Sequence, residues 1–154
     1  DQIEKLEADG TVKVFSVSSG YNEGWFLNVD PATAHPAMLD VNVRKAVALA
    51  TDRFSIVKDL LKPDINPVNA TFWDNTPGYA ADTLKPYPYD PEEAKRLLDE
   101  AGWVKGADGI RAKGGQKFSV SIATTAGNNG GTTIATDPQY PASYDNVCIC
   151  QRWD

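Results

Sequence analysis

The sequence predicts a mixed α/β fold, and three features support that prediction. Two amphipathic helices in tandem are expected within residues 40–61. A further helix has a clear start signal at Asp90. Apolar runs that alternate or continue over a few residues occur at Val12–Val17, Trp25–Val29 and Phe118–Ile122, and such runs are typical of β-strands.

The composition fits one globular domain with a hydrophobic core. The chain has 154 residues, a formal net charge of -6 and 42% hydrophobic residues. The acidic balance, without a cluster of Lys or Arg, argues against nucleic acid as a partner, because phosphate binding requires a basic surface. No apolar run approaches the length of a membrane-spanning helix.

Each of the tandem helices has its own start signal. Asp40 is expected to cap the first helix, because its carboxylate can accept from the free N–H groups of the opening turn. Asp52 is expected to cap the second helix in the same way. The apolar spacing then predicts one buried face on each helix. These faces consist of Val43, Ala46, Val47 and Ala50 on the first helix and of Ile56, Val57, Leu60 and Leu61 on the second.

The other helices are predicted at Asp1–Ala8 and after Asp90. The first would turn Ile3 and Leu6 inward and end at Gly10. The second begins with a capping carboxylate, a proline in the first turn and a glutamate three residues after the cap. Its buried face would be Ala94, Leu97, Leu98 and Ala101, with Gly102 at its end.

The strands are predicted from the placement of their apolar residues. Val12 and Val14 alternate, and Val17 continues the run. Trp25–Val29 is apolar on both faces, which is typical of a central strand. In the last strand Phe118, Val120 and Ile122 would face one side, with Ser119 and Ser121 on the other.

Two long segments resemble a known family in their residue sequence as well as in the spacing of their apolar residues. The segment NVRKAVALATDRFSIVKDLL, residues 42–61, is similar to "VRQALAYAIDRQAIV" of the family 5 extracellular solute-binding proteins. The segment KPYPYDPEEAKRLLDEAGW, residues 85–103, is similar to the family's "PYDPEKAKALLAEAGW". Residues 109–115 and the strand after them resemble the family's "DGI…KDGKPL" hairpin. The motifs occur in the family's order, which is a far more specific signal than one short motif.

The resemblance implies one lobe of a periplasmic-binding-protein-like fold of type II, cluster C. It implies the substrate-binding component of an ABC importer, without enzymatic activity or cofactor. Its partners would be a peptide or similar small solute, an ABC permease and the lobe that this chain lacks. The location would be periplasmic or extracellular, whether or not a lipid anchors the protein to the cell membrane. Residues 1–128 would form the lobe, 129–136 a Gly/Thr-rich connector or an engineered junction, and 137–154 a returning strand.

Aromatic residues in loops and near strand ends are the candidate ligand contacts, because a cleft needs flat apolar faces and a few orienting polar groups. The candidates are Tyr21, Trp25, Phe72, Trp73, Trp153 and Asp154. For Trp25 and Trp103, core packing is at least as good an explanation. Phe72 and Trp73 lie in a proline-rich, aromatic loop, residues 62–89. Asp154 enters only because the resemblance, loose at this end of the chain, implies an acidic residue that holds a ligand amine.

Other chemistry is less well supported by the residues. Glu92 with Glu93, or Asp108 with Asp90, could act as paired carboxylates in a small hydrolase, but two glutamates in a first helical turn are explained by the helix dipole. His35, the only histidine, is expected on the surface, and no serine lies in a nucleophile-elbow sequence. A signalling or adhesion module on the same fold is the other alternative.

The two cysteines carry a separate expectation. Cys148 and Cys150 are two residues apart, so a bond between them would be strained. One histidine and two cysteines are too few ligands for a zinc site. Both cysteines are therefore expected as free thiols.

Overall fold

The computed structural model describes residues 2–10, 12–15, 24–60, 67–71, 74, 84–121 and 149–150. The helices are α1 (Gln2–Asp9), α2 (Val41–Ala50), α3 (Arg53–Leu60) and α4 (Pro91–Glu100), with a short 3-10 helix, Pro36–Leu39, before α2. The strands are β1 (Val104–Lys105), β2 (Arg111–Lys113), β3 (Gln116–Lys117), β4 (Val120–Ser121) and β5 (Ile149–Cys150). Within this part of the chain, no helix is both long and apolar enough to cross a membrane.

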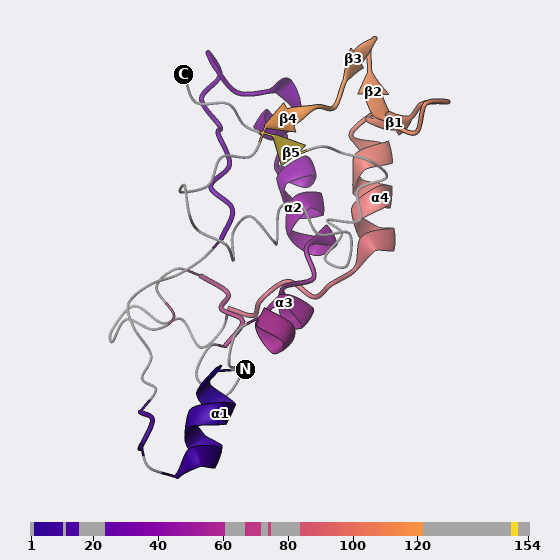
Figure 1. The fold of residues 1–154 in the computed structure, drawn as a ribbon. Coiled ribbons are helices and arrows are strands. Elements are labelled where there is room, and N and C mark those ends of the chain that lie inside the picture. The colour runs from indigo at the N-terminus through magenta and orange to yellow at the C-terminus, as the bar shows by residue number, and fades with distance from the viewer. Residues whose placement is uncertain are drawn as a thin grey trace.

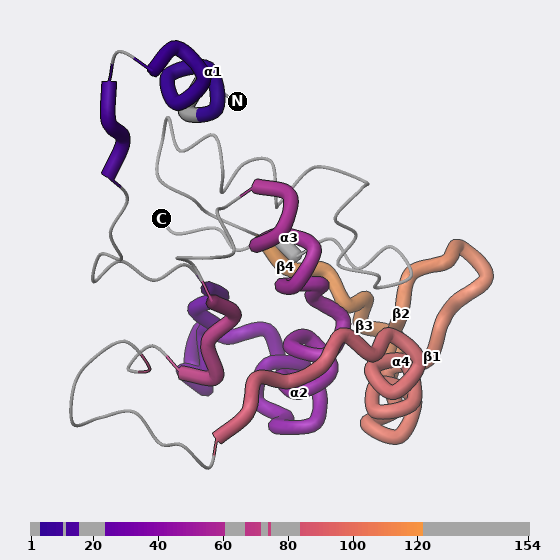
Figure 2. The backbone as a smooth tube through the Cα atoms, turned by 90° about the horizontal axis from the view of Figure 1, so that it is seen from below, coloured from indigo at the N-terminus to yellow at the C-terminus, as the bar shows by residue number. Residues whose placement is uncertain are grey.

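The centre of the fold is the packing of α2 against α4, which lie side by side in both views (Figures 1 and 2). The small antiparallel sheet β1-β2-β3 follows α4 at one end, whereas α1 lies at the opposite end of the molecule (Figure 1). Strands β4 and β5 form a separate parallel pair, in which Val120 is opposite Ile149. One described sheet is thus antiparallel and the other parallel.

The predicted caps are all present. Asp40 accepts from the Asn42 N–H over 2.8 Å at the start of α2. Asp52 accepts from the Ser55 N–H over 3.0 Å at the start of α3. Asp90 accepts from the Glu93 N–H over 3.0 Å at the start of α4. Each carboxylate satisfies a donor that has no partner within its own helix, which explains why the chain turns into helix at these points.

The predicted buried faces hold for α2 and α4 but only in part for α3. The four predicted residues of α2 are buried, as are Ala94, Leu97 and Leu98 of α4, while Ala101 packs against them half-buried. In α3, Ile56 is buried and Val57 half-buried, but Leu60 is exposed. Leu61 lies outside the described residues. The prediction for Leu60 was wrong, and the described core cluster, to which α2 and α4 both contribute, contains no residue of α3.

Two predictions at the start of the chain differ in outcome. The helix and its end at Gly10 are confirmed, since Gly10 takes a left-handed φ of 70°. Leu6, however, is exposed instead of turned inward. The side chain of Ile3 lies outside the description.

The two early strands are not formed in the described residues. Residues 12–15 and 24–29 have no assigned strand pairing. Phe26 is 73% exposed, so the prediction of a strand buried on both faces was wrong. The third predicted strand begins later than expected: Phe118 is buried and Ser119 exposed, but β4 begins only at Val120. Ile122 lies outside the described residues.

Candidate functional site

Of the predicted ligand contacts, Trp25 lies in the described part of the chain, whereas Tyr21, Phe72, Trp73, Trp153 and Asp154 lie outside it. The Trp25 ring is half-buried and packs against the core formed by α2 and α4. Its indole Nε1 donates to Thr51 Oγ1 over 3.1 Å.

Thr51 links Trp25 to the end of α2. The side chain of Thr51 is buried, and its hydroxyl donates in turn to the Val47 carbonyl over 2.9 Å. One buried hydroxyl therefore joins the tryptophan to the last turn of α2 and restricts the orientation of the ring. Trp25 thus has a firm structural role, and its solvent-accessible part leaves room for a contact as well.

Of the loop that carries Phe72 and Trp73, residues 67–71, 74 and 84–89 are described. Residues 67–71 are called the first limb, and residues 84–90, which include the helix cap Asp90, are called the second limb. The first limb is closed by Asp74. Its carboxylate accepts from the Ala70 N–H over 2.6 Å, from the Thr71 N–H over 3.0 Å and from the Thr71 hydroxyl over 2.5 Å. The Asp74 N–H donates to the Thr71 carbonyl over 3.5 Å.

These bonds change the acidity of Asp74. The Thr71 hydroxyl and, after it, the Ala70 N–H hold the pKa of the Asp74 carboxyl below its usual value, because hydrogen bonds to a carboxylate favour its charged form. The ionised carboxylate is therefore part of the structure of the first limb at neutral pH.

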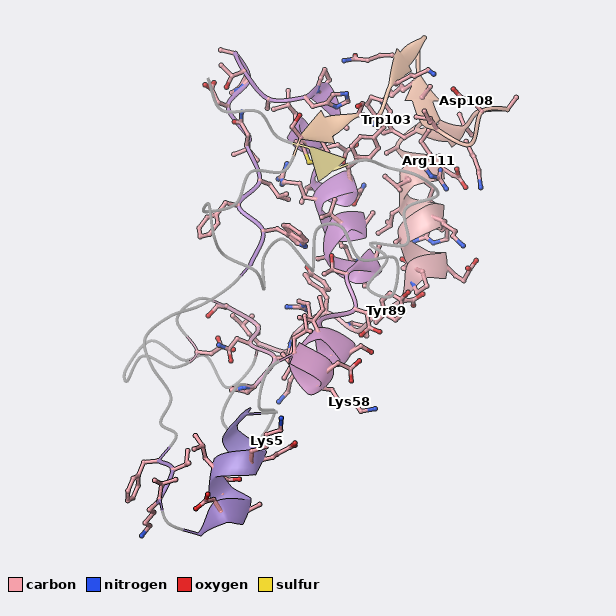
Figure 3. All side chains as sticks on the ribbon, in the orientation of Figure 1. Lys5, Lys58, Tyr89, Trp103, Asp108 and Arg111 are labelled. Carbon is pink, nitrogen blue, oxygen red and sulfur yellow. The ribbon has the colours of Figure 1, made fainter. Side chains whose placement is uncertain are left out.

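Arg53, the first residue of α3, contacts both limbs. Its Nη1 donates to the Asn69 carbonyl over 3.1 Å, and its Nη2 donates to the Tyr87 carbonyl over 2.9 Å. Burial lowers the pKa of the Arg53 guanidinium, which nevertheless stays protonated near neutral pH. Figure 3 shows Tyr89 of the second limb close to α3, in agreement with these contacts.

Sequence reasoning missed both Arg53 and Asp74. The only signal for Arg53 was its place directly after the capping Asp52, inside the segment that resembles the family motif. Its carbonyl partners lie 16 and 34 residues further along the chain, and no local sequence pattern predicts these contacts. For Asp74, the signal was a carboxylate three residues after a threonine in a loop, which is typical of side-chain turns.

His35 is not the surface residue that the sequence suggested. Its ring is half-buried and lies 5.6 Å from the ring of Phe118 and 5.4 Å from that of Trp103. Nδ1 accepts from the Ala37 N–H over 3.2 Å, so the other ring nitrogen, Nε2, is the one that donates to the Lys117 carbonyl at 3.1 Å. Both nitrogens therefore have structural partners. The expectation failed because the strands after α4 bring Phe118 and Lys117 onto the histidine.

Trp103, by contrast, is a core residue, since it is only 3% exposed. It lies between α4 and the antiparallel sheet, next to Arg111 (Figure 3). The buried Arg111 donates to the Trp103 carbonyl over 2.6 Å and to Asp99 over 2.5 Å. Core packing, the alternative that the sequence left open for Trp103, is the one observed.

The candidate catalytic carboxylates all have structural partners. Glu92 pairs with Lys95, and Glu93 pairs with Arg96, both on the exposed side of α4. The pairing with Arg96 lowers the pKa of Glu93. Asp90 caps α4 and Asp108 bonds to Lys117 at 2.6 Å and to the Ile110 N–H. These contacts explain the four carboxylates without an enzymatic role.

An open hollow lies between α4 and β1, and most of its charged side chains are in ion pairs. It is lined by Glu92, Lys95, Arg96, Asp99, Val104, Lys105 and Arg111. Besides the pairs already named, Arg96 bonds to Glu100. Within the described residues, no group of three or more His, Cys, Asp or Glu is placed to hold a metal ion. Cys148 and the side chain of Cys150 lie outside this description.

The chain matches, over residues 1–136, the family described as "Bacterial extracellular solute-binding proteins, family 5 Middle". This chain belongs to that family. The family resemblance seen in the sequence is thereby confirmed, and so is the assignment to a class of binding proteins that are not enzymes. Members of this class act in the periplasm or outside the cell.

Similar proteins include both peptide-binding and metal-binding members. The chain is 38% identical over 95 residues to the oligopeptide-binding protein AppA of Bacillus subtilis, a match that covers 58% of this chain and 17% of the relative. It is 34% identical over 93 residues to the nickel-binding periplasmic protein of Escherichia coli, covering 59% and 17%. The chain therefore spans only a small part of the length of the curated relatives it matches.

A solved structure gives the same result for the fold. The crystal structure of NikA from Brucella suis in complex with Fe(III)-EDTA is similar with a TM-score of 0.64 and 32% identity. The similarity covers 82% of this chain and 24% of NikA. The chain is thus a mixed α/β piece of a cluster C periplasmic-binding-protein fold, as predicted.

Proposed function

We propose that the whole protein is the substrate-binding component of an ABC importer, and that this chain forms one lobe of it and half of its ligand cleft. The observation that carries the proposal is the family match over residues 1–136. The similarity to an oligopeptide-binding protein over 95 residues supports it. The ligand in this proposal is a peptide or a similar small solute, bound when two lobes close by a hinge motion.

The proposed cleft side of the lobe is the end of α2 with the neighbouring limbs. Trp25 supports this placement because it offers a fixed aromatic surface bonded to Thr51, which lies two residues before Arg53. Tyr21, Phe72, Trp73, Trp153 and Asp154 complete the proposed set of ligand contacts. Aromatic faces suit a peptide or sugar-like ligand, since they bury apolar area and leave orientation to a few polar groups.

The proposal also includes the surroundings of the protein. The partners are an ABC permease and the second lobe, and the location is periplasmic or extracellular, with or without a lipid anchor. Residues 1–128 are proposed as the lobe, 129–136 as the connector and 137–154 as a returning strand. The parallel pairing of β5 with β4 supports a returning strand in this lobe.

The test is ligand-induced stabilisation of the full-length protein. Peptides of two to five residues, nickel with free histidine, and maltotriose are each titrated while the melting temperature is followed. A ligand at a hundred times its Kd stabilises the folded state by about 2.7 kcal/mol, which is readily measured as a shift in melting temperature. We expect a saturable shift with a peptide. If none of these ligands shifts the melting temperature, the proposal is contradicted. If only the nickel complex shifts it, the ligand is a nickel complex and not a peptide.

A further inference from the structure

Arg53 is the side chain that joins the two limbs of the candidate ligand loop to each other. The accepting carbonyls, those of Asn69 and Tyr87, are far apart in the chain, yet one guanidinium reaches both, at 3.1 and 2.9 Å. The bonds made by Asp74 stay within the first limb, because they end on Ala70 and Thr71. They close that limb locally without attaching it to the helices, whereas the Arg53 bond does attach it.

The backbone of Arg53 is itself held in place by hydrogen bonds. The Arg53 N–H donates to the Thr51 carbonyl over 2.9 Å, and Asp52 caps the helix that Arg53 begins. The second limb has a separate attachment, since the Asp90 N–H donates to the Leu49 carbonyl at the end of α2 over 2.8 Å. The junction of α2 and α3 is thus the fixed frame, and Arg53 connects it to both limbs.

The geometry requires an arginine in particular. A guanidinium presents several N–H donors in a rigid plane, so its two terminal nitrogens can serve two carbonyls in fixed directions. A lysine ammonium is a single point with rotatable donors and does not hold two acceptors in a defined relation. The bond from Arg53 to the Asn69 carbonyl is partly buried and so is less open to competition from water, whereas the bond to the Tyr87 carbonyl is exposed.

We propose that Arg53 is a positioning residue for ligand binding, which sets the separation of the first and second limbs. This inference rests on the proposed function, because it assumes that the two limbs border the ligand cleft. It assigns Arg53 no contact with the ligand itself.

The experiment compares Arg53→Met, Arg53→Lys and the control Lys58→Met in the full-length protein. Lys58 is an exposed cation on the same helix, so its replacement removes a charge without touching the limbs. Amide hydrogen exchange is measured without ligand, at Asn69, Ala70 and Thr71 of the first limb and at Tyr87 and Tyr89 of the second. Affinity is measured by calorimetry with the peptide that stabilises the wild-type protein most.

Arg53→Met should raise exchange about tenfold or more in both limbs and weaken peptide binding about tenfold. Arg53→Lys should recover only part of each effect, and Lys58→Met should change neither. Should Arg53→Met fail to fold, the Arg53→Lys variant gives the same comparison at smaller amplitude.

Unchanged exchange in the limbs would overturn the proposed link. Faster exchange with unchanged affinity would overturn its role in binding. Wild-type protein that binds no peptide would count against the proposed function instead, and the exchange data would still decide whether Arg53 joins the limbs.

Discussion

Replacing Asp90 with alanine isolates the energy of one helix cap. The Asp90 carboxylate accepts from the Glu93 N–H over 3.0 Å at the start of α4. Its backbone N–H, which donates to the Leu49 carbonyl, is kept by any residue except proline. Glu92 and Glu93 also remain, so the favourable charge at the helix start is largely preserved. The substitution therefore removes the capping bond and little else.

The expected cost follows from this restricted loss. Loss of an aspartate cap destabilises a protein by about 0.5–2 kcal/mol, and a value near 1 kcal/mol is expected here because the surrounding contacts stay. For a chain of this size, that corresponds to roughly 2–4 °C in melting temperature. Asp90→Asn keeps a side-chain acceptor and should lose only a few tenths of a kcal/mol.

The assay is urea denaturation followed by far-UV circular dichroism, with Asp59→Ala as the matched control. Asp59 is an exposed aspartate in the last turn of α3, where a negative charge gains nothing from the helix dipole. Its replacement should change the free energy of unfolding by less than about 0.5 kcal/mol. A denaturation midpoint for Asp90→Ala equal to that of the control would refute the capping argument.

Four further predictions concern the core, acidity, thiols and ligand loop. Phe118 is fully buried, so Phe118→Ala should lower the free energy of unfolding by about 3–5 kcal/mol, and a loss under about 1 kcal/mol in urea denaturation would contradict its core role. Because the folded pKa of Asp74 lies below the usual 3.8, its contribution is complete above that pH and is lost as the pH falls through the folded value. Amide exchange in the first limb should therefore rise in acid relative to its intrinsic rate, and Asp74→Asn should abolish that dependence. Thiol titration of unfolded, unreduced protein should find Cys148 and Cys150 both free. A titration that finds no free thiol would indicate a disulfide. In the full-length protein, Trp73→Ala should weaken ligand binding by about 1–3 kcal/mol without changing the melting temperature of the unliganded form, whereas the reverse pattern would make Trp73 a core residue.

The helices could be predicted from the sequence because their signals are local. Asp40, Asp52 and Asp90 each precede the helix that they cap, and the apolar period of α2 identifies its buried face. Strand pairing depends instead on residues distant in the chain, so the apolar run at Trp25–Val29 predicted a strand that the described residues do not form. The placement of His35 failed for the same reason, since its ring contacts Phe118 and bonds to Lys117, both more than 80 positions away.

The candidate site follows the same division between local and distant information. Aromatic residues in a proline-rich loop could be recognised in the sequence, but the contacts that hold the loop could not. Three contacts that frame the proposed site come from residues 47–53, where α2 ends and α3 begins. Thr51 holds Trp25, the Leu49 carbonyl accepts from the second limb, and Arg53 donates to both limbs. The core face of α2 and the frame of the proposed site therefore belong to one continuous segment. Substitutions of buried α2 residues should lower stability and ligand affinity together, because they displace this segment as a whole. Within this segment, side chains that do not enter the core, with Arg53 as the clearest case, can separate affinity from stability.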